Sequence, residues 1–151
     1  MKKTMLLVAL LYAGVVCAQQ IPTNAKTFFD KKYPTAESVS WTETSEGYQV
    51  EFETDIHSPV ATFNKQGAWL ETRTYLEEEE IPSPIQSWYY EKHADGSIES
   101  AEKLERKDGT YYELTIEEDE DIFLFTFSKE GKVLKTIKLA EVEENDEEED
   151  E

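Results

Sequence analysis

The apolar residues of two stretches follow the spacing of a helix that buries one face. The first stretch, IPTNAKTFFDKKYP, begins at Ile21, and the second, IPSPIQSWYYEKH, begins at Ile81. In both, apolar residues recur at positions i, i+4, i+7 and i+8, which is the pattern of an amphipathic helix. Each stretch has a proline at its second position, where the first turn of a helix tolerates one. The pattern predicts a helix that ends near Tyr33, before Pro34, and a second helix that ends between residues 93 and 96.

After each of these helices, apolar and polar residues alternate, which is typical of strands with one buried face. The alternation is clearest in YQVEF, residues 48–52, and in YELTI, residues 112–116. Polar turns that contain Gly67 and Gly131 then separate the last two strands of each set, as in antiparallel hairpins. We therefore predict an α+β fold of two tandem repeats, each one helix followed by a four-stranded antiparallel sheet, with the helices on one face.

Residues 1–18 have the composition of a secretory signal peptide. A basic start at Lys2 and Lys3 precedes an apolar run that ends in small residues near Ala18, and the run is short for a membrane span. Two alternatives remain open, a retained membrane anchor and lipid attachment at Cys17. We predict cleavage after Ala18, a periplasmic or secreted location in a bacterial envelope, and no membrane contact after cleavage.

The mature chain is predicted to have two repeats and a tail. The repeats would span residues 19–75 and residues 76–140, and the acidic residues 141–151 would form a disordered tail. Cys17 is the only cysteine of the sequence, so cleavage would leave no thiol and no disulfide. The core must therefore supply the stability of the fold.

The chain is strongly acidic, with 34 Asp and Glu against 15 Lys and Arg and a net charge of −19. Nucleic acid and anionic lipid surfaces need a cationic patch on the protein, so we expect neither as a partner. The charge favours one of two partners, a basic envelope or secreted protein or a divalent cation. No cofactor motif is present, and the acidic runs predict at most weak calcium binding because none has the spacing of a calcium-binding loop.

Several segments together resemble one protein family. The segments are FFDKKYPTAESVSW, GYQVEF, ATFNKQGAWLETRT, IPSPIQSWYYEKH, YYELTI and FSKEGKVLK. They are similar to the PepSY-like, beta-lactamase-inhibitor-like domain of bacterial envelope proteins, over residues 21–139. The resemblance implies a tandem fold in which each half packs one helix against a curved antiparallel sheet and leaves the far face of the sheet open. It includes no active-site motif and transfers no catalytic position.

The strand alternation predicts which side chains face the helices and which face away from them. Leu70 and Leu134 are expected to face the helices. The residues expected to face away are Trp69, Glu71, Arg73, Tyr75, Ile122, Leu124 and Val133. Tryptophan, tyrosine and arginine dominate the binding energy of many protein interfaces, so we interpret five of these residues, Trp69, Arg73, Tyr75, Leu124 and Val133, as a candidate partner-binding surface. The alternative is that the two halves, or two copies of the chain in a homodimer, bury this stripe against each other.

No pattern predicts catalysis. His57 and His93 each lie near an aspartate, but a metal site needs three or more converging ligands, so we expect structural or incidental roles for both. No serine stands on a Gly-x-Ser-x-Gly turn. The sequence therefore predicts a non-catalytic exported binding module, not an enzyme, that captures or inhibits another envelope protein through the open sheet face. The alternative is an envelope protein that binds or buffers calcium.

Overall fold

The computed structural model describes residues 20–141. The predicted signal peptide, residues 1–18, lies outside them. So does the predicted acidic tail, residues 141–151, except for Glu141. In chain order the elements are α1 (Thr23–Lys32), β1 (Glu37–Glu43), β2 (Gly47–Glu53), β3 (Val60–Asn64), β4 (Trp69–Tyr75), the short 3-10 helix η1 (Glu78–Glu80), α2 (Ser83–Lys92), β5 (Ser97–Arg106), β6 (Gly109–Glu118), β7 (Asp121–Ser128) and β8 (Val133–Glu141). Neither helix of this described part is long and apolar enough to cross a membrane.

Both α-helices lie where the apolar spacing predicts them. α1 begins after Pro22 and ends at Lys32, with Tyr33, the residue before Pro34, as its C-cap. α2 begins after Pro82 and ends at Lys92, with His93 as its C-cap. In both helices the backbone N–H of the residue at the C-terminal end donates to the carbonyl four residues earlier. Because proline disfavours helical geometry in the residue before it, Pro34 explains the end of α1.

The eight strands form one antiparallel sheet in chain order, from β1 to β8. The prediction of two tandem repeats, each with its own four-stranded sheet, is therefore wrong. β4 pairs with β5 from Glu71 opposite Arg106 to Tyr75 opposite Glu102, and this pairing joins the two sets of strands. An unpaired strand edge leaves backbone N–H and C=O groups without partners, so the pairing removes two such edges. The predicted boundary between residues 75 and 76 falls at the end of β4, inside the single sheet.

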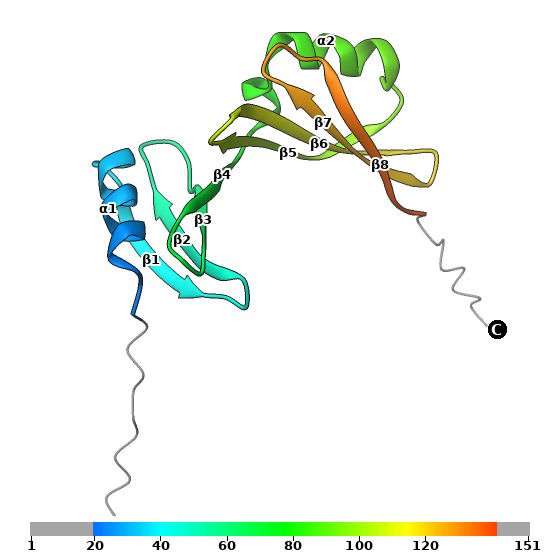
Figure 1. Cartoon of the computed structure of the whole chain (residues 1–151). Coiled ribbons are helices and arrows are strands. Elements are labelled where there is room, and N and C mark those ends of the chain that lie inside the picture. The colour runs from blue at the N-terminus through cyan, green and yellow to red at the C-terminus, as the bar shows by residue number, and fades with distance from the viewer. Residues whose placement is uncertain (1–19, 142–151) are drawn as a thin grey trace, which may run out of the picture.

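Both helices lie on the same face of the sheet. Directly paired residues of antiparallel strands point to the same side, so the register can be followed across the strands. Thr72 faces α1, because its hydroxyl bonds to the hydroxyl of Tyr33 at the end of that helix. Thr74 lies on the same side as Thr72 and is linked by the register across β5 and β6 to Phe127, which packs under α2. We call this side the helix face and the other side the open face. Figure 1 shows the helices over opposite ends of the sheet, so neither covers its middle.

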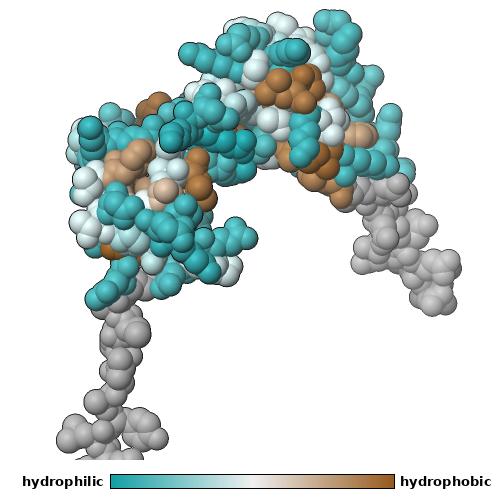
Figure 2. All heavy atoms as spheres, viewed as in Figure 1, coloured by the Kyte–Doolittle hydropathy of each residue, from teal (hydrophilic) through white to brown (hydrophobic). Residues whose placement is uncertain are grey.

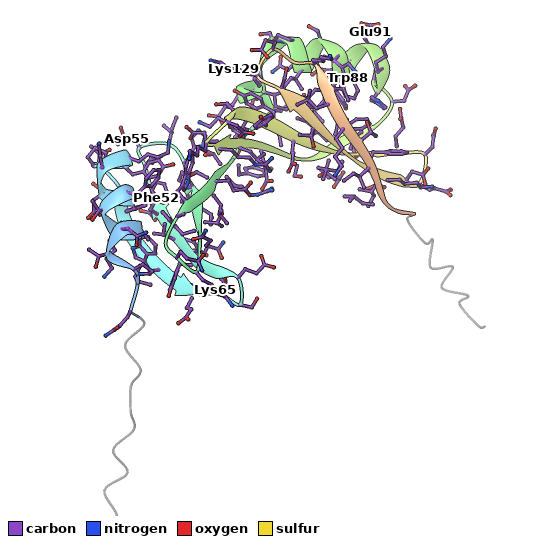
Figure 3. The ribbon with its side chains drawn as sticks, viewed as in Figure 1. Phe52, Asp55, Lys65, Trp88, Glu91 and Lys129 are labelled. Carbon is purple, nitrogen blue, oxygen red and sulfur yellow. The ribbon has the colours of Figure 1, made fainter. Side chains whose placement is uncertain are left out.

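Each helix covers its own hydrophobic core. The buried residues of the core at α1 are Ala25 and Phe29 of the helix and Val50, Phe52, Ala61 and Phe63 of the sheet. Those of the core at α2 are Ile85 and Tyr89 of the helix together with Leu76, Ile81, Ala101, Leu114, Ile116, Phe125 and Phe127. Figure 3 shows Phe52 between α1 and the sheet, and Trp88 on the sheet side of α2. The surface seen in Figure 2 is mostly hydrophilic, with hydrophobic residues in small separate patches.

Candidate functional site

The open face carries a connected group of charged side chains at the middle of the sheet. Nε of Arg73 donates to Glu71 Oε1 at 2.6 Å, and its Nη1 donates to Glu102 Oε2 at 2.7 Å and to Glu113 Oε2 at 3.1 Å. Nε of Arg106 donates to the other carboxylate oxygen of Glu71, Oε2, at 2.8 Å. We call these five residues the Arg73 network. The network spans β4, β5 and β6, so it ties together the two sets of strands that the β4–β5 pairing joins.

The register explains why carboxylates can gather here. Glu102 and Glu113 are paired directly across β5 and β6, where two like charges repel each other. Nη1 of Arg73 bonds to both and offsets this repulsion. Burial by itself would raise the pKa of Glu71, but the hydrogen bonds from Arg106 and Arg73 outweigh burial and hold that pKa below its ordinary value. Glu71 is therefore ionised at neutral pH, and the network has one more carboxylate than guanidinium groups.

An apolar residue supports the network from below. Leu104 is 0 % exposed, although the register places it on the open face and it belongs to neither of the two cores. Its cross-strand neighbours on that face are Arg73 on one side and Tyr111 on the other. An arginine can cover apolar surface with its methylene groups while its guanidinium stays in contact with water and carboxylates. The side chain of Arg73 is therefore held in two ways, by hydrogen bonds from its guanidinium to the carboxylates and by packing of its methylene groups beside Leu104.

Three of the five predicted partner-binding residues lie on the open face. Arg73 is at the centre of the network. Tyr75 is two residues further along β4, is paired with Glu102, and is 55 % exposed. Leu124 of β7 is partly buried and is paired with Ile137 of β8.

Trp69 and Val133 lie on the helix face instead, so the placement predicted for them is wrong. Both pack against the cores under the helices. A β-bulge is the reason in each case, because the pairing of β3 with β4 skips Leu70 and the pairing of β7 with β8 skips Leu134. One extra residue in a strand reverses the side to which the residues beyond it point. Leu70 and Leu134 were expected in the cores and are 50 % and 51 % exposed.

A family model matches the chain over residues 12–60 and 57–135, which together are most of its length. The family is described as beta-lactamase-inhibitor-like, PepSY-like. The chain belongs to this family. The resemblance seen in the sequence is thereby confirmed. None of the curated proteins matches this PepSY-like chain.

Solved structures share the fold of the PepSY-like chain. A BLIP-like protein from Bacteroides fragilis matches with a TM-score of 0.72 and 20 % identity, over 82 % of this chain and 90 % of that one. A DUF2874 family protein from Bacteroides ovatus matches with a TM-score of 0.69 and 21 % identity, over 78 % and 86 %. Another, from Bacteroides uniformis, has a TM-score of 0.68 and 16 % identity, over 78 % and 88 %. These likenesses establish the fold, and a shared fold does not establish a shared function.

The two histidines of the PepSY-like chain each contact a different glutamate. Nε2 of His57, in the loop between β2 and β3, is 3.1 Å from Glu80 Oε1. Nδ1 of His93, at the end of α2, is 2.8 Å from Glu118 Oε2, and the His93 ring packs against Trp88. In the described part of the chain, no three or more His, Cys, Asp or Glu side chains form a group that could hold a metal ion. Calcium binding stays a prediction.

Sequence reasoning placed Arg73 and Glu71 together on the face away from the helices and missed the three other members of the network, Glu102, Arg106 and Glu113. Part of the signal was present, because Glu71 and Arg73 alternate along one strand and Glu113 is a polar position of the YELTI strand. The rest was absent, because no local pattern indicates that β4 and β5 are neighbours. Glu102 and Arg106 reach Arg73 and Glu71 only through that pairing.

Proposed function

We propose that this PepSY-like protein is a non-catalytic exported module that captures or inhibits another envelope protein through the open face of its sheet. The observation that carries the proposal is the pair of side chains at the middle of this face, which neither α1 nor α2 covers. There an exposed tyrosine, Tyr75, stands beside a guanidinium group that is already held in place. Tyrosine and arginine are enriched among the residues that contribute most to protein–protein binding.

The Arg73 network supports this role because its side chains are ordered before a partner arrives. Binding normally costs about 0.5–1.5 kcal/mol for each flexible side chain that becomes immobile. Arg73 is bound to three carboxylates and is 38 % exposed, so it can contact a partner without much of this cost. A surface of this kind favours capture of a folded protein over catalysis.

The charge of the open face favours a basic partner. The register places more acidic than basic residues on this face; the acidic ones are Glu37, Glu51, Glu53, Glu71, Glu102, Glu113 and Glu117, and the basic ones are Arg73, Arg106 and Lys135. Complementary charge raises the rate of association and makes it sensitive to salt. Capture should therefore weaken as the ionic strength is raised.

The location in the envelope rests on the sequence of residues 1–18, which has the features of a secretory signal peptide. The name of the Bacteroides fragilis neighbour, a BLIP-like protein, agrees with a protein-binding role. The leader sequence thus supports the location of the protein, and the name of the neighbour supports its role in binding.

Cross-linked capture from the native cell envelope tests the proposal. The full chain, produced with its own leader, is the bait, and Tyr75→Ala is compared with Tyr90→Ala. The two tyrosines are matched in exposure, since Tyr75 is 55 % and Tyr90 is 58 % exposed, but Tyr90 lies on α2, where its hydroxyl donates to Glu78 Oε1. We expect a partner that Tyr90→Ala retains and Tyr75→Ala loses, with the melting temperature of Tyr75→Ala no lower than that of Tyr90→Ala. If Tyr75→Ala and the charge reversal Glu102→Lys both capture as well as the natural chain, the open face is not the binding surface.

A further inference from the structure

A cleft on the helix face lies at the middle of the sheet, between α1 and the turn that joins β5 to β6. Its volume is about 750 Å³, within the roughly 300–1,000 Å³ range of small-molecule pockets. The cleft exists because the two helices lie over opposite ends of the sheet (Figure 1). It is on the opposite side of the sheet from the Arg73 network, so it is separate from the face proposed above to bind a protein.

One wall of the cleft is aromatic and firmly held. The rings of Phe28 on α1 and Trp69 on β4 are stacked, with centroids 5.2 Å apart and planes inclined by 23°. Nε1 of Trp69 donates to Thr72 Oγ1 at 3.0 Å, and Nζ of Lys32 lies 4.9 Å from the centre of the indole ring. Phe28 is 37 % exposed, which is high for such a large apolar side chain. The exposed ring of Phe28, stacked on the indole, therefore gives the cleft a preformed aromatic surface beside the ammonium group of Lys32.

The turn between β3 and β4 closes one end of the cleft against α1. Nδ2 of Asn24 donates to the carbonyl of Gln66 at 2.8 Å. Gly67 has a φ of +76° and leaves no room for a side chain, because a Cβ atom there would lie 2.6 Å from Oδ1 of Asn24. The backbone approaches α1 this closely only with glycine at this position. This end of the cleft is thus part of the packed fold.

The other wall is polar and carries both signs of charge. Glu105 at the end of β5 and Asp108 in the following turn supply carboxylates, and Lys32 and Lys107 supply ammonium groups. Nζ of Lys32 is 3.4 Å from Glu105 Oε1. Arg106 also lines the cleft, but its guanidinium belongs to the Arg73 network on the other face. The charges of this wall therefore cancel, in a chain whose net charge is −19.

We propose that this cleft binds a neutral saccharide. A hydroxyl group both donates and accepts hydrogen bonds, and the polar wall offers carboxylate acceptors on Glu105 and Asp108, ammonium donors on Lys32 and Lys107, and the hydroxyl of Thr110. Oδ2 of Asp108 already accepts a hydrogen bond from the Tyr111 hydroxyl at 3.2 Å, so its other oxygen is the acceptor offered to a ligand. The C–H face of a sugar ring fits against the flat aromatic wall. Because the two signs of charge balance in this wall, it gives no net attraction to an anion or a cation, so a ligand without net charge is favoured.

The indole N–H signals of the ¹H–¹⁵N NMR spectrum test this proposal directly. The chain has three tryptophans, and two of them are internal controls, because Trp41 packs against Phe63 in one core and Trp88 against Phe127 in the other. The full chain is titrated with maltotriose, cellotriose and N-acetylchitotriose. We expect at least one of them to shift the Trp69 signal until it saturates, while the Trp41 and Trp88 signals stay in place.

Variants then locate the binding. Phe28→Ala removes part of the aromatic wall and should weaken the affinity about tenfold. Asp108→Asn keeps the shape of the exposed turn and should weaken it severalfold, whereas Tyr90→Ala, far from the cleft on α2, should leave it unchanged. The proposal is overturned if none of the three sugars moves the Trp69 signal up to about 10 mM, where a millimolar Kd would be detected. It is also overturned if sodium benzoate shifts the signal and no sugar does, or if Phe28→Ala binds as tightly as the natural chain.

Discussion

Replacing Arg73 by methionine should destabilise the protein at pH 7 and do so much less at low pH. The substitution keeps an apolar side chain beside Leu104, so the packing below the network is largely preserved. It removes the hydrogen bonds to Glu71, Glu102 and Glu113. It also leaves Glu102 and Glu113 directly opposite each other with no guanidinium between them. Both effects act through ionised carboxylates.

The size of the loss follows from the exposure of the network. Exposed ion pairs contribute about 0.2–1 kcal/mol, and the side chain of Arg73 is 38 % exposed, so solvent screening places its three pairs at about 0.5 kcal/mol each. The uncompensated pair of like charges across two strands adds roughly 0.5 kcal/mol. We therefore expect the free energy of unfolding to fall by about 2 kcal/mol at pH 7.

The pH dependence follows from the pKa of Glu71, which the two arginines hold below its ordinary value in the folded protein. A carboxylate with a lowered folded pKa contributes stability that is present above the unfolded pKa and lost as the pH falls through the folded one. Arg73→Met removes part of this contribution. The difference in the free energy of unfolding between the variant and the natural chain should thus have its full size at pH 7. It should shrink below about pH 4, where carboxylates protonate.

Urea unfolding followed by circular dichroism, at pH 7 and at about pH 3.5, measures both quantities. A second substitution, Glu102→Gln, isolates the repulsion: added to Arg73→Met, it should restore about 0.5 kcal/mol at pH 7. A loss of equal size at both pH values would refute the electrostatic explanation. So would a double variant that is no more stable than Arg73→Met alone.

Two further predictions test the bulge in β4 and the partly buried tyrosine at the C-terminal end of α1, Tyr33. Leu70→Ala should cost less than about 0.5 kcal/mol because Leu70 is exposed, whereas Phe63→Ala in the core should cost about 3–5 kcal/mol; similar losses in urea unfolding would contradict the bulged register. Burial raises the pKa of Tyr33 to about 12, and the charge of Glu105 adds to this effect against the hydrogen bond with Thr72. Because the folded state holds this proton more tightly than the unfolded chain, stability should fall as the pH rises from about 10 towards 12, and by less in Tyr33→Phe. Equal losses in both proteins over that range would show that Tyr33 is not the group responsible.

Both candidate sites depend on the pairing of β4 with β5. On the open face this pairing brings Arg106 and Glu102 to Arg73, and on the helix face it brings Glu105 to the side of α1, where Lys32 meets it. The joint between the two sets of strands is thus also the place where chemically diverse side chains from distant parts of the chain converge. A substitution that separated β4 from β5 should remove both sites together.

Local sequence patterns were sufficient to predict the features of the structure that depend on residues close in the sequence. The spacing of apolar residues and the prolines that flank the helices predicted α1 and α2, because a helix is built from contacts three and four residues apart. The alternation around Val50 and Leu114 predicted buried strand faces, since successive side chains of a strand point to opposite sides. The same reasoning correctly placed Arg73 and Tyr75 on the face away from the helices, because both follow the bulge in β4.

By itself, then, the sequence determined the helices, the alternation of the strands and the family, all of which are properties of neighbouring residues or of the whole-length pattern. The tertiary structure alone decided that Leu70 and Leu134 bulge, that Trp69 therefore turns from the open face into the cleft, and that β4 meets β5. The physical reason is that the choice of a strand's partner and register depends on backbone hydrogen bonds to a distant segment and on how the sheet packs under its helices. A bulge of a single residue interrupts the pairing at one place only, yet it changes the side of the sheet to which Trp69 points.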